Sequence, residues 1–152
     1  MAQRRMFNKV ITNSDDFLDM PVSSQNLYFH LGMNADDDGF INNWKSIIKL
    51  TGSKEDDLKV LIAKQYILPF ESGVIVIKHW RLNNYLRNDR YSETKFKKEA
   101  KKLYLDESLV YQLDTSGIHR LDKISIDKNR LDKISIDIPT NNDIDIESIF
   151  GD

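Results

Sequence analysis

An acidic stretch in the first third of the chain, NADDDGFINNWK (34–45), carries the residue types of a calcium-binding loop. Asn34, Asp36 and Asp38 stand at the first, third and fifth positions of such a loop, and a glycine stands where it turns sharply. The twelfth position should supply a bidentate glutamate but is Lys45, whose positive charge repels a divalent cation. We therefore interpret the stretch as an acidic, glycine-ended turn between two helices, and we expect no metal site.

Residues for covalent, redox or metal chemistry are scarce in the rest of the sequence. The 152 residues include no cysteine, which excludes disulfides, iron–sulfur clusters, cysteine-ligated zinc and thiol nucleophiles. The histidines His30, His79 and His119 are scattered, and the chain has no glycine-rich phosphate loop. We expect a protein that is not an enzyme and that carries no cofactor.

The formal net charge of −2 conceals an uneven distribution of charge. Residues 1–102 hold 17 basic and 13 acidic side chains, whereas residues 103–152 hold 5 and 11. Residues 78–102 are the most basic segment, with nine lysines and arginines against three acids. Because lysine and arginine bind nucleic acid mainly by neutralising phosphates, this segment favours a polyanionic partner such as DNA. A solvated helix face is the simpler explanation of such a pattern and stays open.

Helical signals dominate the first part of the chain. Apolar periodicity and capping residues predict a short helical turn over 14–20, a helix over about 23–35 and another over 42–50. Ser53 is expected to cap the helix that follows, with Asp56 three residues later as the acid of a capping box.

The pattern then changes to that of strands. Residues 67–70 and 74–77 predict a β-hairpin with a three-residue turn that a glycine assists. Helical patterning resumes after Trp80, and apolar residues at i, i+4 and i+7 predict a last amphipathic helix that begins at Ser92 and includes Leu103. Three helices with a tight glycine turn between the second and third, followed by a hairpin, are the order of a winged helix-turn-helix domain. We expect a mainly α fold with a small β-hairpin, which is an α+β fold.

The C-terminal part contains an internal repeat, because RLDKISID occurs at 120–127 and again at 130–137. The copies are too few to bury a stacked core, and acidic residues occur throughout. We expect a winged-helix domain with its trailing basic helix over residues 1–104, and an acidic, repeat-containing linker or tail, largely disordered, over 105–152.

The helix that follows Ser53 would be the recognition helix of such a domain. Its first turn, Lys54-Glu55-Asp56-Asp57, is mostly acidic and would repel phosphates, so phosphate contacts are expected from its later lysines, the hairpin and the basic segment behind it. The candidate DNA contacts are Lys59, Lys64, Lys78, Arg81, Arg87, Arg90, Lys95, Lys97 and Lys98. The alternative is a protein-interaction or dimerisation module that does not touch DNA, with Val60 and Ala63 at its interface.

Two long strings resemble a known family. LDMPVSSQNLYFHLGMNADDDGFI (18–41) and LKVLIAKQYILPFESGVIVIKHWRLNNYLRNDRYSET (58–94) are similar to the N-terminal winged-helix region of phage replisome organisers. These are replication-initiation proteins of prophages in low-GC Gram-positive bacteria, related to DnaD-like primosome proteins. The resemblance implies a DNA-binding protein without enzymatic activity, which binds duplex origin DNA and helps to assemble the replisome with replication proteins such as a helicase loader.

Targeting signals are absent from the sequence. It contains no run of about 18 apolar residues, and mixed sequence rather than an apolar stretch follows the first five residues. We expect a protein of the bacterial host cytoplasm that has no membrane partner, and we leave open whether it forms a homo-oligomer.

Overall fold

A computed structural model describes residues 4–85 and 87–114 of the chain. Helices and small antiparallel sheets share this part of the chain, which confirms the predicted α+β class. The helices are α1 (Lys9–Thr12), α2 (Asp15–Leu18), α3 (Val22–Asn34), α4 (Trp44–Thr51), α5 (Glu55–Ala63), α6 (Trp80–Asn83) and α7 (Lys97–Ala100). The strands are β1 (Phe40–Ile41), β2 (Ile67–Pro69), β3 (Ile75–Ile77), β4 (Leu103–Leu105) and β5 (Tyr111–Leu113).

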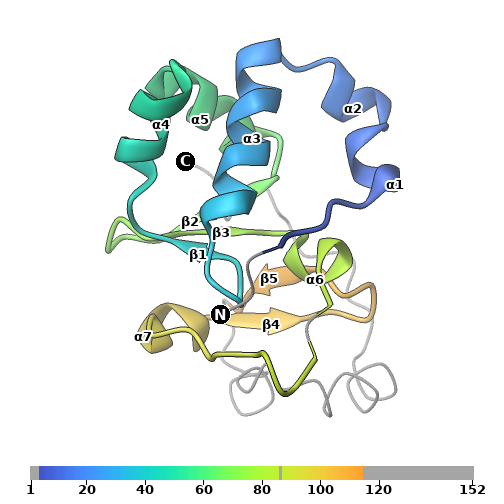
Figure 1. The fold of residues 1–152 in the computed structure, drawn as a ribbon, viewed down its shortest axis with the longest axis vertical. Helices are drawn as coiled ribbons and strands as arrows, with labels where there is room; N and C mark the ends of the chain where they lie inside the picture. Colours follow the sequence, from blue (N-terminus) through green and yellow to red (C-terminus); the bar gives the residue numbers. More distant parts are fainter. Residues whose placement is uncertain (1–3, 86, 115–152) are drawn as a thin grey trace.

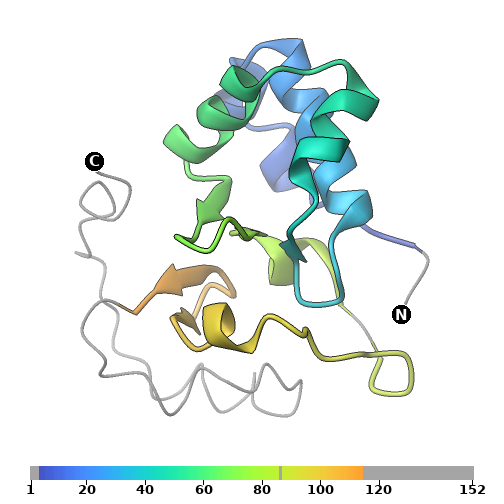
Figure 2. The same cartoon turned by 90° about the vertical axis from the view of Figure 1, so that its left-hand side faces the viewer.

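The elements lie in layers (Figure 1). Helices α1 to α5 form an upper layer, the sheet of β1, β3 and β2 lies beneath it, and α6, α7 and the β4–β5 hairpin lie on the other side of that sheet. The turned view shows the same order of layers (Figure 2). No helix within the two described ranges has the length and apolar character that a bilayer crossing requires.

The helices α3, α4 and α5 form where the apolar periodicity predicted them. Leu27, Tyr28 and Leu31 of α3 are buried, and α4 ends at Gly52, which adopts the left-handed conformation with φ of 72°. The start of α5 corrects the prediction by one residue, because Lys54 rather than Ser53 is the N-cap residue.

The predicted hairpin is confirmed, and it belongs to a larger sheet. Strands β2 and β3 pair antiparallel around a turn at 71–73, closed by the hydrogen bond from Phe70 N–H to the Val74 carbonyl (2.9 Å). Strand β3 also pairs antiparallel with β1, so the strand order is β1-β3-β2. The sequence pattern did not predict β1, since a two-residue strand is too short to show periodicity.

The predicted helix from Ser92 is wrong. Only residues 97–100 are helical, and Leu103 belongs to β4, where it pairs with Leu113 of β5. Thr94 N–H donates to a carboxylate oxygen of Asp38 at 2.8 Å, and this long-range bond holds the preceding segment in an irregular conformation. Tertiary contacts therefore override the helical spacing of the apolar residues.

The expected domain boundary after residue 104 falls inside β4, and the ordered fold continues at least to residue 114. Tyr111 is 2% exposed and belongs to the main hydrophobic cluster, together with Trp80, Tyr28, Phe17 and Phe40. The expectation of disorder is therefore wrong for residues 105–114. The repeats at 120–137 lie outside the described residues.

Candidate nucleic-acid interface

Asp37 and Asp38 of the acidic turn are buried inside the protein, and Asp36 is half-buried. Both carboxylate oxygens of Asp38 accept from the Tyr91 hydroxyl at 2.8 Å, and Oδ1 also accepts from Arg81 Nη2. The Tyr111 hydroxyl donates to the backbone carbonyl of Asp38 at 2.8 Å, and Thr94 N–H donates to its Oδ2. The carboxylate therefore already has donors around both oxygens.

Asp37 makes a second set of bonds in the same turn. Its Oδ1 lies 3.1 Å from Arg5 Nη2, and Ser92 N–H donates to Oδ2 at 3.0 Å. The Trp80 indole N–H donates to its backbone carbonyl at 3.0 Å. The described residues contain no group of three or more histidines, aspartates and glutamates placed to hold a metal ion. In this chain, the aspartates that resemble calcium ligands instead form hydrogen bonds and ion pairs that join segments from both layers.

Burial removes two of the predicted DNA contacts from the surface. Arg81 is ion-paired with Asp38 inside the protein, and Lys78 is 5% exposed, with its ammonium 3.1 Å from Gln65 Oε1. Neither side chain can reach a phosphate of a DNA duplex lying against the outer surface, so the expectation of such contacts from these two residues is corrected. The physical reason is that Lys78 directly follows the buried strand β3 and Arg81 lies on the buried side of α6, which the charge count along the sequence does not reveal.

Most of the remaining predicted contacts are exposed. Lys64 is the partial exception, because it is half-buried and its ammonium lies 3.0 Å from Asp16. The exposed predicted residues are Lys59, Arg87, Arg90, Lys95, Lys97 and Lys98, and Lys101 and Lys102, which the prediction omitted, are exposed beside them.

Helix α7, within the basic segment 78–102, adjoins the β2–β3 hairpin. Ser72, in the hairpin turn, donates to Glu99 of α7 at 2.6 Å, so the turn and this helix are in direct contact. The carbonyl of Gly73 accepts from the Trp44 indole at the start of α4 (2.8 Å). The hairpin turn thus lies between the first residue of α4 and the lysine-bearing helix α7, although these elements are far apart in sequence.

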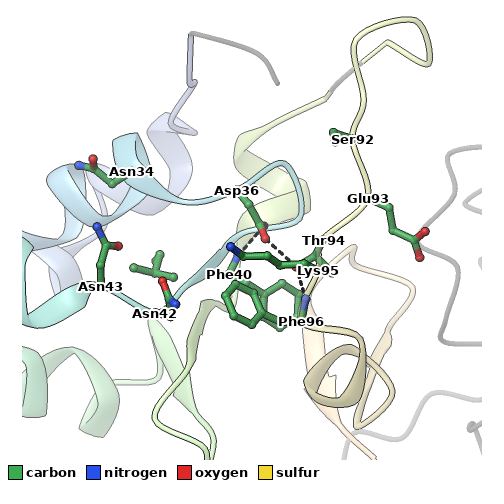
Figure 3. A pocket seen from close by; sticks show the side chains of 11 residues that line it. Asn34, Asp36, Phe40, Asn42, Asn43, Ser92, Glu93, Thr94, Lys95 and Phe96 are labelled. Carbon is green, nitrogen blue, oxygen red and sulfur yellow. Dashed lines mark hydrogen bonds between the residues drawn. The ribbon is translucent and has the colours of Figure 1, made fainter.

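A groove of about 430 Å³ separates the α3–β1–α4 connection from residues 92–96 (Figure 3). The rings of Phe40 and Phe96, with centroids 6.3 Å apart, lie in its lining. Its polar lining is provided by Asn34, Asn42, Asn43, Ser92, Glu93 and Lys95. Amide groups and an ammonium can hydrogen-bond to phosphates or base edges. The half-buried ring of Phe96 can stack on a base, whereas Phe40 is 1% exposed and belongs to the core. Sequence reasoning missed the asparagines because nothing in their spacing singles them out.

Asp36 closes one side of this groove (Figure 3). Its carboxylate accepts from the Thr94 hydroxyl at 2.6 Å and from the Phe40 N–H at 3.0 Å. Burial raises the pKa of Asp36 above its ordinary value, against the opposing effect of these hydrogen bonds. The side chain therefore fixes the groove wall by its bonds within the protein.

The surface of α5 offers little positive charge. Glu55 and Asp56 are exposed in its first turn, and the ammonium of Lys59 lies 3.9 Å from Asp56. Val60 is half-buried and packs against the core, whereas Ala63 is exposed. The two residues of the alternative protein interface therefore differ in accessibility.

Comparison of the chain with protein-family models, curated proteins and solved structures finds no match.

Proposed function

We propose that the chain is a DNA-binding protein and that residues 22–77 form a winged helix. The order α3, β1, α4, α5, β2 and β3 supports this assignment, because three helices precede a hairpin whose second strand also pairs with β1. In this arrangement α5 is the recognition helix and the turn at 71–73 is the tip of the wing.

The observation that carries the proposal is the contact between the wing and the basic segment. The Ser72–Glu99 bond brings the wing tip to α7, in which Lys97 and Lys98 are exposed, and Lys95 just before the helix is exposed as well. Lysines next to a wing can neutralise phosphates of a duplex that the wing touches.

Phosphate contacts supply most of the affinity in this mode of binding. The acidic first turn of α5 disfavours close approach of phosphates to that helix, so base readout through it is modest. The asparagine-lined groove provides further donors beside Lys95 and Phe96, the residues that lead into α7.

We also propose a role in the initiation of phage DNA replication. The similarity of residues 18–41 and 58–94 to phage replisome organisers supports this role. Its partners would be duplex origin DNA and replication proteins such as a helicase loader.

Fluorescence anisotropy of a labelled duplex, titrated with protein at several salt concentrations, tests DNA binding. We expect the logarithm of the association constant to fall linearly with the logarithm of the salt concentration. Arg87→Ala with Arg90→Ala should flatten this slope by up to about 2, because each lost phosphate contact removes about 0.9. The control Arg4→Ala with Lys9→Ala removes the same charge from two exposed residues at the N-terminal end, and should change the slope less.

A wild-type protein that binds no duplex even at low salt would overturn the proposal. The protein-interaction module would then be the better explanation, for which the acidic, exposed Glu55 and Asp56 of α5 are the favourable observation. Ala63→Arg, which alters the exposed last residue of that helix, would in that case weaken self-association measured by analytical ultracentrifugation.

A further inference from the structure

A second cavity, of about 230 Å³, lies among α1, α2, the α5–β2 junction and the residues that follow β3. Its polar lining includes Ser14, Asp16, Lys64, Gln65, Lys78 and His79. The proposed DNA surface of the wing and α7 uses none of these side chains.

Lys78 is the unusual member of this lining, because it is a buried cation without an anionic partner. It is 5% exposed, and its ammonium makes a hydrogen bond to the neutral amide oxygen of Gln65 at 3.1 Å. No carboxylate oxygen of the described residues lies within 4.0 Å of that ammonium. Burial lowers the pKa of Lys78, and Asp106 opposes this effect from farther away. A buried charge is costly unless an opposite charge compensates it.

The partner of Lys78 is held in a strained conformation. Gln65 has a φ of +67°, and it follows α5 at the position where the hydrogen bond from Tyr66 N–H to the Leu61 carbonyl closes the helix end. Glycine is the usual residue at such a position, because a side chain costs energy in the left-handed region. A glycine here would leave Lys78 without the amide oxygen, so the strained residue keeps the ammonium in place.

The other charges in the cavity compensate one another. The carboxylate of Asp16 accepts from Lys64 Nζ and from the Tyr66 hydroxyl, each at 3.0 Å. The first of these bonds lowers the pKa of Asp16. Because Asp16 and Lys64 neutralise each other, the one uncompensated charge among the residues that line the cavity is that of Lys78.

His79 adds a second polar group without a partner. Its Nδ1 is buried and has no hydrogen-bond partner. Burial, together with the neighbouring Lys78, lowers the pKa of His79 to about 4, so the ring is neutral at neutral pH and one ring nitrogen carries a hydrogen.

We propose that this cavity binds a phosphate group, with the ammonium of Lys78 as the counter-charge and the His79 ring as a neutral donor. A tetrahedral oxyanion supplies the acceptors and the negative charge that both side chains lack. Such a group can come from free inorganic phosphate or from a terminal phosphate of a nucleotide or nucleic acid. The cavity and its charges are independent of the proposed DNA surface.

Titration with inorganic phosphate at constant ionic strength, followed by isothermal calorimetry, tests this site. The wild type should bind one phosphate saturably, and Lys78→Met, which keeps the length of the side chain, should weaken binding by about tenfold or more. Lys49→Met removes an exposed charge from α4, outside both the cavity and the proposed DNA surface, and should leave phosphate affinity unchanged. Parallel titrations with a nucleoside 5′-monophosphate, and with oligonucleotides that carry or lack a 5′-phosphate, distinguish the sources.

A wild type that shows no saturable binding of any of these phosphates would overturn the proposal, as would a Lys78→Met variant that binds like the wild type. Nuclear magnetic resonance of the wild type gives a readout that needs no variant. Added phosphate should shift the ring signals of His79 but not those of His30, which does not line the cavity. Unmoved His79 signals under saturating phosphate would also refute the site.

Discussion

The guanidinium Nη2 of Arg81 lies 2.5 Å from Oδ1 of Asp38, and both side chains are buried, 4% and 0% exposed. This pair joins α6 to the turn before β1. Since Thr94 N–H and the Tyr111 hydroxyl also bond to Asp38, the same residue connects the lower layer to the sheet. The stretch 34–45, whose residues resemble a cation-binding loop, therefore holds the lower layer in place through Asp38.

Replacing Arg81 with alanine should destabilise the protein severely. Removing one partner leaves the buried charge of Asp38 without its counter-charge, which costs about 3–5 kcal/mol of unfolding free energy. Urea denaturation measures this loss. Arg87→Ala is the control, because its pair with Asp89 (3.5 Å) is exposed and should be worth less than about 1 kcal/mol. Equal losses in the two variants would contradict the role assigned to Asp38.

Asp57 should be important for stability, although it lies next to the exposed Asp56. Its carboxylate accepts from the Lys54 N–H at 2.9 Å, which caps α5, and from the hydroxyls of Ser23 (2.6 Å) and Ser24 (3.1 Å) on α3. Asp57→Ala should cost about 2 kcal/mol in urea denaturation, whereas Asp56→Ala, which loses only an exposed pair, should cost less than about 0.5 kcal/mol. A loss of similar size for both would be inconsistent with a bridge between α3 and α5.

The same residue predicts an acid dependence. Burial acts to raise the pKa of Asp57, but the hydrogen bonds from Ser23, Lys54 and Ser24 outweigh it and hold the pKa below 3.8. A carboxyl group with a lowered pKa in the folded state stabilises the protein above its unfolded pKa, and this stabilisation is lost as the pH falls through the folded pKa. Stability measured from pH 5 downwards should therefore fall less steeply in Asp57→Asn than in the wild type. Parallel curves would contradict the assignment.

Some of this structure could be predicted from the sequence and some could not, for physical reasons. The periodic residues Leu27 and Leu31 and the glycine after α4 act locally, so the upper helices and the hairpin were predictable. The helix expected from Ser92 failed because its backbone donors bond to Asp37 and Asp38, more than 50 residues earlier in the chain. For the same reason the sequence predicted that Arg81 is an exposed DNA contact, because its partner Asp38 is distant in sequence. The groove and its asparagines depend on packing, which spacing alone does not reveal.

Gly39 should tolerate a side chain less well than Gly73. Both adopt positive φ, at 92° and 93°, so alanine costs about 1–2 kcal/mol of backbone strain at either position. A Cβ at Gly39 would lie 2.7 Å from the Trp80 ring, whereas a Cβ at Gly73 would meet nothing within 4 Å. Thermal or urea denaturation should therefore show a further loss of about 1–3 kcal/mol in Gly39→Ala. If both variants unfold alike, Trp80 does not pack as described.

Lys59 tests whether α5 enters a groove of DNA. The side chain is 74% exposed on the helix that would be the recognition helix. If α5 reads bases, Lys59→Ala should weaken binding to a duplex selected from a random pool more than binding to random duplex, as competition anisotropy would measure. An equal loss on both duplexes would limit Lys59 to phosphate contact.

The dependence of DNA affinity on salt in two single-charge variants tests the central claim, that the wing and α7 bind phosphates. Lys98 of the α7 segment is exposed, and no carboxylate of the described residues lies within 4.0 Å of its ammonium. Lys9 is also an exposed lysine, on α1 in the upper layer (Figure 1). Lys98→Ala should reduce the log–log salt slope on duplex DNA by about 0.9, and Lys9→Ala should leave it unchanged. Equal slopes in wild type and Lys98→Ala would contradict the claim.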